Sequence, residues 1–224
     1  ADDAEAVRLN AAYALASAGA AGLSALAQDL RREAQASEPL ATAKTPDNAH
    51  GTNPTAPVAA HALASATGGT AVAADLLDDG HWLVRAMAAG ALGNMGLAAT
   101  EVSDRLVASA ADAHWWVRRN ALEALGRVAE LGDAALDRVT DCIDDEDYRV
   151  RRNAAIALRG TSRVTDHTVG ALARMLNDDN RYNRFYAAEA LRNVAPVAPE
   201  AQQVLLDYLF TSRWCPLTDS EDRY

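Results

Sequence analysis

A spacing of 33 residues recurs along the chain and constrains its fold more than any other feature. Four segments align without gaps at this spacing: 79–93, 112–126, 145–159 and 178–192. Each begins with an aspartate, has an arginine six residues later and carries a leucine near its end. A repeat of this length is typical of a protein built from stacked identical units. The chain is therefore expected to fold as an array of repeats.

Two more copies precede these four. Asp2 and Arg8 match Asp79 and Arg85 at an offset of 77 residues, and residues 59–64 form a degenerate copy. Residues 37–57 contain four prolines and no apolar period, so we predict an insertion loop there. The sequence thus predicts one repeat domain over residues 1–210 with about six copies, followed by a tail, 211–224, that caps the last repeat or docks a partner.

Each copy has the pattern of two helices. Apolar residues in the first half recur every three or four positions, at Val117, Ala121 and Leu125 in the clearest copy. A second apolar stripe follows, including Val139 and Ile143. The chain contains 52 alanines, and such small side chains let neighbouring helices approach closely. We predict an all-α fold, an α-solenoid in which each helical hairpin stacks on the next.

The pattern D-x5-R-x2-AA-x-ALG resembles HEAT repeats, in particular the short HEAT-like variety noted in phycobilisome lyases. The resemblance covers nearly the whole chain apart from the insertion and the last dozen residues. It implies a superhelix of helical hairpins. HEAT arrays serve many unrelated tasks, so the resemblance predicts the fold far more strongly than the function.

The repeated aspartate and arginine favour a structural role. An aspartate just before a helix accepts hydrogen bonds from the free amides of the first turn, and the arginine six residues later is placed to reach the aspartate of an adjacent repeat. We therefore expect a ladder of ion pairs along the array. Its candidate members are Asp2, Arg8, Asp79, Arg85, Asp112, Arg118, Asp145, Arg151, Asp178 and Arg184.

Aromatic residues gather where each first helix begins. Five of the chain's 12 aromatic residues lie at this position: Trp82, Trp115, Trp116, Tyr148 and Tyr182. One interpretation is that each ring covers the end of the neighbouring repeat. The other is a binding strip, because tryptophan and tyrosine dominate the energetics of protein interfaces.

A second candidate surface lies on the second helices, which in HEAT arrays usually line the concave face. The charged candidates there are Glu101, Asp104, Asp137, Asp141, Arg174 and Asp207. Their acidic excess suits a basic or polar protein partner. The formal charge of the chain is −10, which disfavours nucleic acid because phosphate contacts need a basic face. The alternative is that the charged surface on the second helices is simply solvated and binds no partner.

No catalytic, metal-binding or nucleotide-binding motif occurs, and we expect no metal and no cofactor. Cys142 and Cys215 lie in different surroundings, which favours two reduced thiols and a cytoplasmic location. The chain opens without methionine, so we expect a fragment or a processed product. We favour a non-catalytic scaffold that binds another protein or peptide. The alternative is an enzyme subunit, or the repeat domain of a larger enzyme, similar to the lyases that attach a bilin to a cysteine.

Overall fold

The computed structural model describes residues 10–41, 58–96, 101–127, 130–196 and 198–211. It divides into two compact units, residues 1–135 and 136–224. The described residues are helical or irregular and contain no strand, which confirms the all-α prediction. The fold class is an α-solenoid of helical hairpins.

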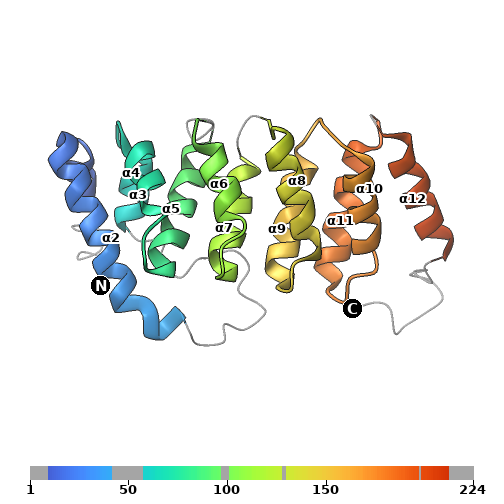
Figure 1. Ribbon diagram of the computed structural model, residues 1–224, viewed down its shortest axis with the longest axis horizontal. Coiled ribbons are helices and arrows are strands. Elements are labelled where there is room, and N and C mark those ends of the chain that lie inside the picture. The colour runs from blue at the N-terminus through green and yellow to red at the C-terminus, as the bar shows by residue number, and fades with distance from the viewer. Residues whose placement is uncertain (1–9, 42–57, 97–100, 128–129, 197, 212–224) are drawn as a thin grey trace. The chain divides into compact units, whose positions relative to one another are not determined.

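The first unit is a row of helices that follow one another in space as in sequence (Figure 1). Its helices are α2 (Gly19–Ala41), α3 (Val58–Ser65), α4 (Gly69–Leu76), α5 (Trp82–Met95), α6 (Ser103–Ser109) and α7 (Trp115–Leu125). Helix α5 packs against the α3–α4 hairpin and against α7, and α6 packs against α7. Each hairpin therefore buries its apolar side on the next one, as stacking requires.

The second unit repeats the arrangement. It contains α8 (Asp133–Asp141), which begins just before the boundary, then the 3-10 turn η2 (Cys142–Asp144), α9 (Tyr148–Arg159), α10 (Asp166–Met175), α11 (Arg181–Val194) and α12 (Pro199–Thr211). Helix α9 packs against α11, and α11 packs against α10 and α12. The second unit is therefore also built from neighbouring hairpins.

The repeated apolar columns form the core. The leucines of four successive first helices have no exposed surface, and neither do the alanines four residues before them: Leu92, Leu125, Leu158, Leu191, Ala88, Ala121, Ala154 and Ala187. Small residues bring α5 and α7 together, since a Cβ added to Gly93 would lie only 3.2 Å from the Cα of Ala124. Such contacts leave little room for larger side chains between the helices.

The first helices begin with a different cap from the one that the sequence suggested. The side chain that accepts a hydrogen bond from the first turn belongs to His81, His114, Asp147 and Asn180, two residues after each repeated aspartate. The aspartate instead accepts the backbone N–H of that capping residue, as Asp79 does from His81 at 3.0 Å. The aspartate thus holds the turn that presents the cap, because its carboxylate bonds two residues ahead as in an Asx turn.

The insertion and the tail are described only at their edges. Helix α2 continues to Ala41, so residues 37–41 of the predicted loop are helical. The rest of that loop, 42–57, lies outside the described residues, as do Asp2 and Arg8. The last described residue, Thr211, ends α12, and the remaining tail residues also lie outside.

Candidate functional site

The repeated arginines hold two neighbouring repeats at once. In the first unit, Arg85 donates from Nη1 to the backbone carbonyl of Asp79 at 2.9 Å, in its own repeat. Its Nε and Nη2 donate to the two carboxylate oxygens of Asp112 in the next repeat, at 2.7 and 3.0 Å. Two parallel bonds from a planar guanidinium to a carboxylate form a strong and directional ion pair.

The second unit contains the same arrangement. We call it a rung: one arginine bonded to a backbone carbonyl of its own repeat and to the aspartate carboxylate of the next. Arg151 donates from Nη1 to the carbonyl of Asp145 at 2.9 Å and forks onto the Asp178 carboxylate at 2.6 and 3.1 Å. In both units the arginine lies 27 residues before its aspartate. The spacing differs at the start of the array, where Arg31 of α2 lies 48 residues before Asp79 and bonds it at 2.7 Å.

Three other members of the set bond the backbone of their own repeats. Arg118 donates to the carbonyl of Asp112 at 3.0 Å, and Asp145 accepts the backbone N–H of Asp147 at 2.9 Å. Arg184 donates to the carbonyl of Asp178 at 2.7 Å. The backbone half of the rung is therefore present in each repeat from Arg85 onward.

These contacts shift the pKa of the aspartates. Burial raises the pKa of the Asp112 carboxyl, but hydrogen bonds from Arg85 and from the His114 backbone N–H outweigh burial and hold this pKa below its usual value. The same balance, with Arg151 as the donor, lowers the pKa of Asp178. Both carboxylates are therefore charged at neutral pH, and each charge is balanced by an arginine of the preceding repeat.

The candidate tryptophans of the first unit form one stack at the start of α5 and α7. The ring of Trp82 lies on His114 with centroids 3.8 Å apart, and Trp115 stacks on Trp116 at 5.4 Å. Trp116 is only 9% exposed and packs with Ala86 in the core. Trp82 and Trp115 are partly buried against this core, so they are the two tryptophans that offer surface.

The tyrosines of the second unit have arginine neighbours. The guanidinium of Arg149 lies 5.3 Å from the ring centre of Tyr148, and that of Arg181 lies 4.8 Å from the ring centre of Tyr182. Both distances are within the range of cation–π contacts. The aromatic position therefore takes a basic neighbour from its own chain in this unit, whereas it forms an all-ring stack in the first.

Carboxylates on the second helices of the first unit outnumber the cations near them. Arg105 of α6 bonds Asp75 at 3.1 Å and also bonds Asp78, and the side chains of these aspartates are 83% and 79% exposed. Glu101 and Asp104 lie within one turn of Arg105, are exposed, and make no ion pair with another described residue. We call Asp75, Asp78, Glu101 and Asp104 the acidic face of the first unit.

The corresponding charges of the second unit are more nearly balanced. Asp141 lies 4.0 Å from a nitrogen of Arg138 and 3.9 Å from His167, and Arg174 bonds Asp144 at 2.6 Å. The predicted candidates Asp137 and Asp207 are exposed, and Asp207 accepts a hydrogen bond from Gln203 at 2.8 Å.

Three features were not predicted. Asp75 and Asp78 follow the degenerate repeat, where no periodic charge drew attention to them. A hollow of about 550 Å³ in the second unit is lined by residues of α11, α12 and the turn before α11. Phe210 on α12 is 86% exposed. The sequence signal for the hollow was available, because the residue 27 positions after Arg184 is Thr211 and not an aspartate.

Among the described residues there is no cluster of histidine, cysteine, aspartate and glutamate side chains suited to a metal ion. No helix in the described part of the chain has the length and apolar character needed to cross a bilayer. Cys142 is buried as a small apolar side chain.

The profile of HEAT repeats matches residues 70–159 and 143–214, which together make up more than half of the chain. The chain belongs to the HEAT-repeat family. Proteins of known structure share the helical repeat fold. An engineered protein is 22% identical, with a TM-score of 0.55, over 76% of this HEAT protein and 87% of its own chain.

Two more structures extend the comparison. Escherichia coli YibA is 19% identical with a TM-score of 0.55, and the alignment covers 68% of this chain and 57% of YibA. A designed armadillo repeat protein, solved in complex with the peptide (KR)4, is 19% identical with a TM-score of 0.53, over 83% of this chain and 91% of its own. At these identities the likeness establishes the helical repeat fold. No curated protein sequence is similar enough to count as a match.

Proposed function

We propose that this HEAT protein is a non-catalytic scaffold whose first unit binds a basic segment of a partner protein on the acidic face. The observation that carries the proposal is the charge imbalance around Arg105, whose guanidinium pairs with two of the four exposed carboxylates of the acidic face. Uncompensated carboxylates on one surface attract a basic partner and disfavour acidic ones.

The distribution of charge along the sequence also supports placing the binding surface on the first unit. Residues 1–135 contain 9 lysines and arginines against 16 aspartates and glutamates, whereas residues 136–224 contain 12 against 15. The acidic excess therefore lies mainly in the first unit. It would also speed the encounter with a basic partner at low salt, since long-range attraction raises association rates.

The partly exposed tryptophans favour the same partner chemistry. Lysine and arginine side chains gain about 0.5–2 kcal/mol over a tryptophan face. Trp82 and Trp115 lie in the same unit as the acidic face. In the second unit, the guanidinium groups of Arg149 and Arg181 already lie over the tyrosine rings. This supports binding of a basic partner by the first unit.

A structural relative gives a precedent for the ligand. The designed armadillo repeat protein was solved with (KR)4, a peptide of alternating lysine and arginine. That complex belongs to the designed protein, and we carry over only the idea that a helical repeat protein can bind a basic peptide.

The experiment is a fluorescence-anisotropy titration of the full chain with labelled (KR)4. We expect the double variant Glu101→Gln/Asp104→Asn to bind about 5- to 30-fold more weakly, since each lost charge contact is worth about 0.5–1 kcal/mol. The matched control is Asp137→Asn/Asp207→Asn, which makes the same change of net charge in the second unit.

The control decides between a site and a general charge effect. An affinity within about twofold of the parent for the control supports the acidic face. Equal losses in both double variants, or no binding by the parent chain at low salt, would contradict the proposal. Raising the salt from 20 to 150 mM is expected to weaken binding by the parent more than by the Glu101/Asp104 variant, because exposed charges are screened.

A further inference from the structure

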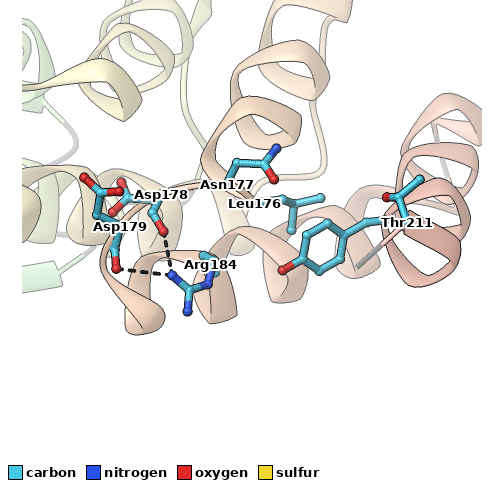
Figure 2. Close-up of a pocket in the computed structure, with 7 residues that line it drawn as sticks. Leu176, Asn177, Asp178, Asp179, Arg184 and Thr211 are labelled. Atoms are coloured by element: carbon cyan, nitrogen blue, oxygen red, sulfur yellow. Dashed lines mark hydrogen bonds between the residues drawn. The ribbon is translucent and has the colours of Figure 1, made fainter. Parts of the chain in front are cut away.

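Arg184 is the one repeated arginine of the second unit that holds only half of a rung among the described residues. Like Arg85 and Arg151, it donates from Nη1 to two backbone carbonyls of its own repeat, those of Asp178 at 2.7 Å and Asp179 at 3.2 Å (Figure 2). In the other two arginines, the same anchor leaves Nε and Nη2 directed at an aspartate of the next repeat. The guanidinium of Arg184 is thus already oriented to receive a carboxylate.

The expected carboxylate is replaced in the sequence. The spacing of 27 residues that links Arg85 to Asp112 and Arg151 to Asp178 leads from Arg184 to Thr211. The Thr211 hydroxyl donates to the carbonyl of Asp207 at 2.8 Å and offers no charge. Within the described part of the chain, Arg184 has no ion-pair partner.

The hollow of the second unit lies at this arginine. Arg184 and Asp179 line it, and so does Thr211 of α12 (Figure 2). Tyr208 of α12 is a further lining residue. Its volume of about 550 Å³ is sufficient for a carboxylate-bearing side chain. Asp178, which also lines it, is committed to the Arg151 fork, so its charge is already balanced.

A carboxylate bound here would repeat the geometry of the other rungs. The anchor at Nη1 fixes the plane of the guanidinium before binding, which reduces the loss of side-chain entropy on forming the two parallel bonds. The aromatic ring of Tyr208 and the methyl group of Thr211 would exclude water from one side. Two parallel N–H groups of a guanidinium match the two oxygens of a carboxylate better than they match a point charge.

We propose that Nε and Nη2 of Arg184 bind a carboxylate of the chain's own acidic segment 219–222, which contains Asp219, Glu221 and Asp222. Thr211 lines the hollow, so the segment that follows starts at its rim. The eight residues from Thr211 to Asp219 reach up to about 26–29 Å when extended, far more than the hollow requires. A tether this short gives a local concentration on the order of millimolar.

This proposal is independent of the acidic face and of its partner. It assigns a different role to part of the tail, as the element that completes the ladder at Arg184. The predicted capping role of residues 211–224 thereby gains a specific contact.

The test measures solvent exchange of the Arg184 Nε–H proton by NMR in the 15N-labelled full chain, with the signal assigned through its loss in Arg184→Lys. We expect exchange about fivefold or more slower than for the exposed Arg192, which corresponds to an ion pair of about 1 kcal/mol. The variant Asp219→Asn/Glu221→Gln/Asp222→Asn should abolish this protection. The control Glu101→Gln/Asp104→Asn/Asp137→Asn, with the same number of charges removed, should retain it.

Three results would overturn the proposal. Arg184 exchange as fast as that of Arg192 would show that no carboxylate is bound. Protection that survives neutralisation of the segment would show that another group is bound. Protection that increases with protein concentration would place the carboxylate on a second molecule.

Discussion

Arg85 donates two parallel hydrogen bonds, from Nε at 2.7 Å and Nη2 at 3.0 Å, to the carboxylate of Asp112 in the following repeat. Both side chains are largely buried, and the same guanidinium also bonds the backbone of its own repeat. The pair therefore fixes the distance between two hairpins as well as contributing energy. Replacing one partner leaves the other charge partly buried and unbalanced.

We expect Arg85→Lys to lower the free energy of unfolding by about 1–3 kcal/mol, because lysine keeps the charge but cannot fork onto a carboxylate. The measurement is urea denaturation followed by circular dichroism. The control is Arg174→Lys, whose pair with Asp144 is exposed on both sides and should change stability by less than about 1 kcal/mol. Equal effects of the two substitutions would contradict a structural role for the ladder.

Acid is expected to weaken the array through the ladder aspartates. The pKa values of Asp112 and Asp178 are lower in the folded chain than the value of about 3.9 usual for an unfolded one. The folded state therefore binds fewer protons, so this stabilisation is present above about pH 4 and is lost as the pH falls below it. Thermal melting of Asp178→Asn between pH 3 and 7 should show a flatter pH dependence than the parent, with asparagine less stable at pH 7.

Two glycines one turn apart in α5 give a paired test of helix packing. A Cβ at Gly90 would meet only the Asn120 side chain at 3.6 Å, whereas one at Gly93 would lie 3.2 Å from the Ala124 Cα. Gly90→Ala should raise stability by up to about 1 kcal/mol through helix propensity. Gly93→Ala should be less stable than Gly90→Ala by about 1–3 kcal/mol, because α5 and α7 must separate. Differential scanning calorimetry of both variants measures the difference, and equal melting temperatures would refute the close approach.

Alanine substitution should distinguish the buried Trp116 from the partly exposed Trp115 by its effect on stability. Trp116→Ala is expected to cost about 3–5 kcal/mol of stability, as for other buried aromatic residues. Trp115→Ala should cost less than half as much, and it should weaken binding of (KR)4 if the tryptophan edge contacts the peptide. Chemical denaturation and anisotropy titration are run on the same samples. A larger stability loss for Trp115→Ala than for Trp116→Ala would contradict the packing.

Much of the fold follows from the sequence, for a simple reason. Leu92 and its equivalents recur at a constant spacing because each hairpin buries the same position on the next, so the period reports the stack directly. The prediction that the repeated aspartate caps the helix was wrong, because an aspartate just before a helix is usually the capping residue. Here Asp79 bonds two residues ahead and leaves His81 to cap, a turn geometry that the residue types alone do not specify.

The candidate site was less predictable. Trp115 and Trp116 are adjacent in the sequence, yet one is partly exposed and the other is core, which depends on the exact angle at which α7 enters the stack. Asp75 and Asp78 gain significance only from their shared contact with Arg105, 30 and 27 residues away. Interactions between repeats that do not recur leave no periodic trace in the sequence.

The rung geometry has a consequence for how such a chain changes over generations. Arg85 and Arg151 each bond the backbone of their own hairpin and the carboxylate of the one that follows, so a 33-residue block of this kind carries both halves of the junction. A duplicated or deleted block would restore the same junction on both sides. We therefore expect duplication or deletion of a whole block to preserve the junction, whereas an insertion of another length would move the arginine away from its aspartate. At Asp79 the bonded arginine is Arg31 of α2, which does not follow the spacing of 27 residues.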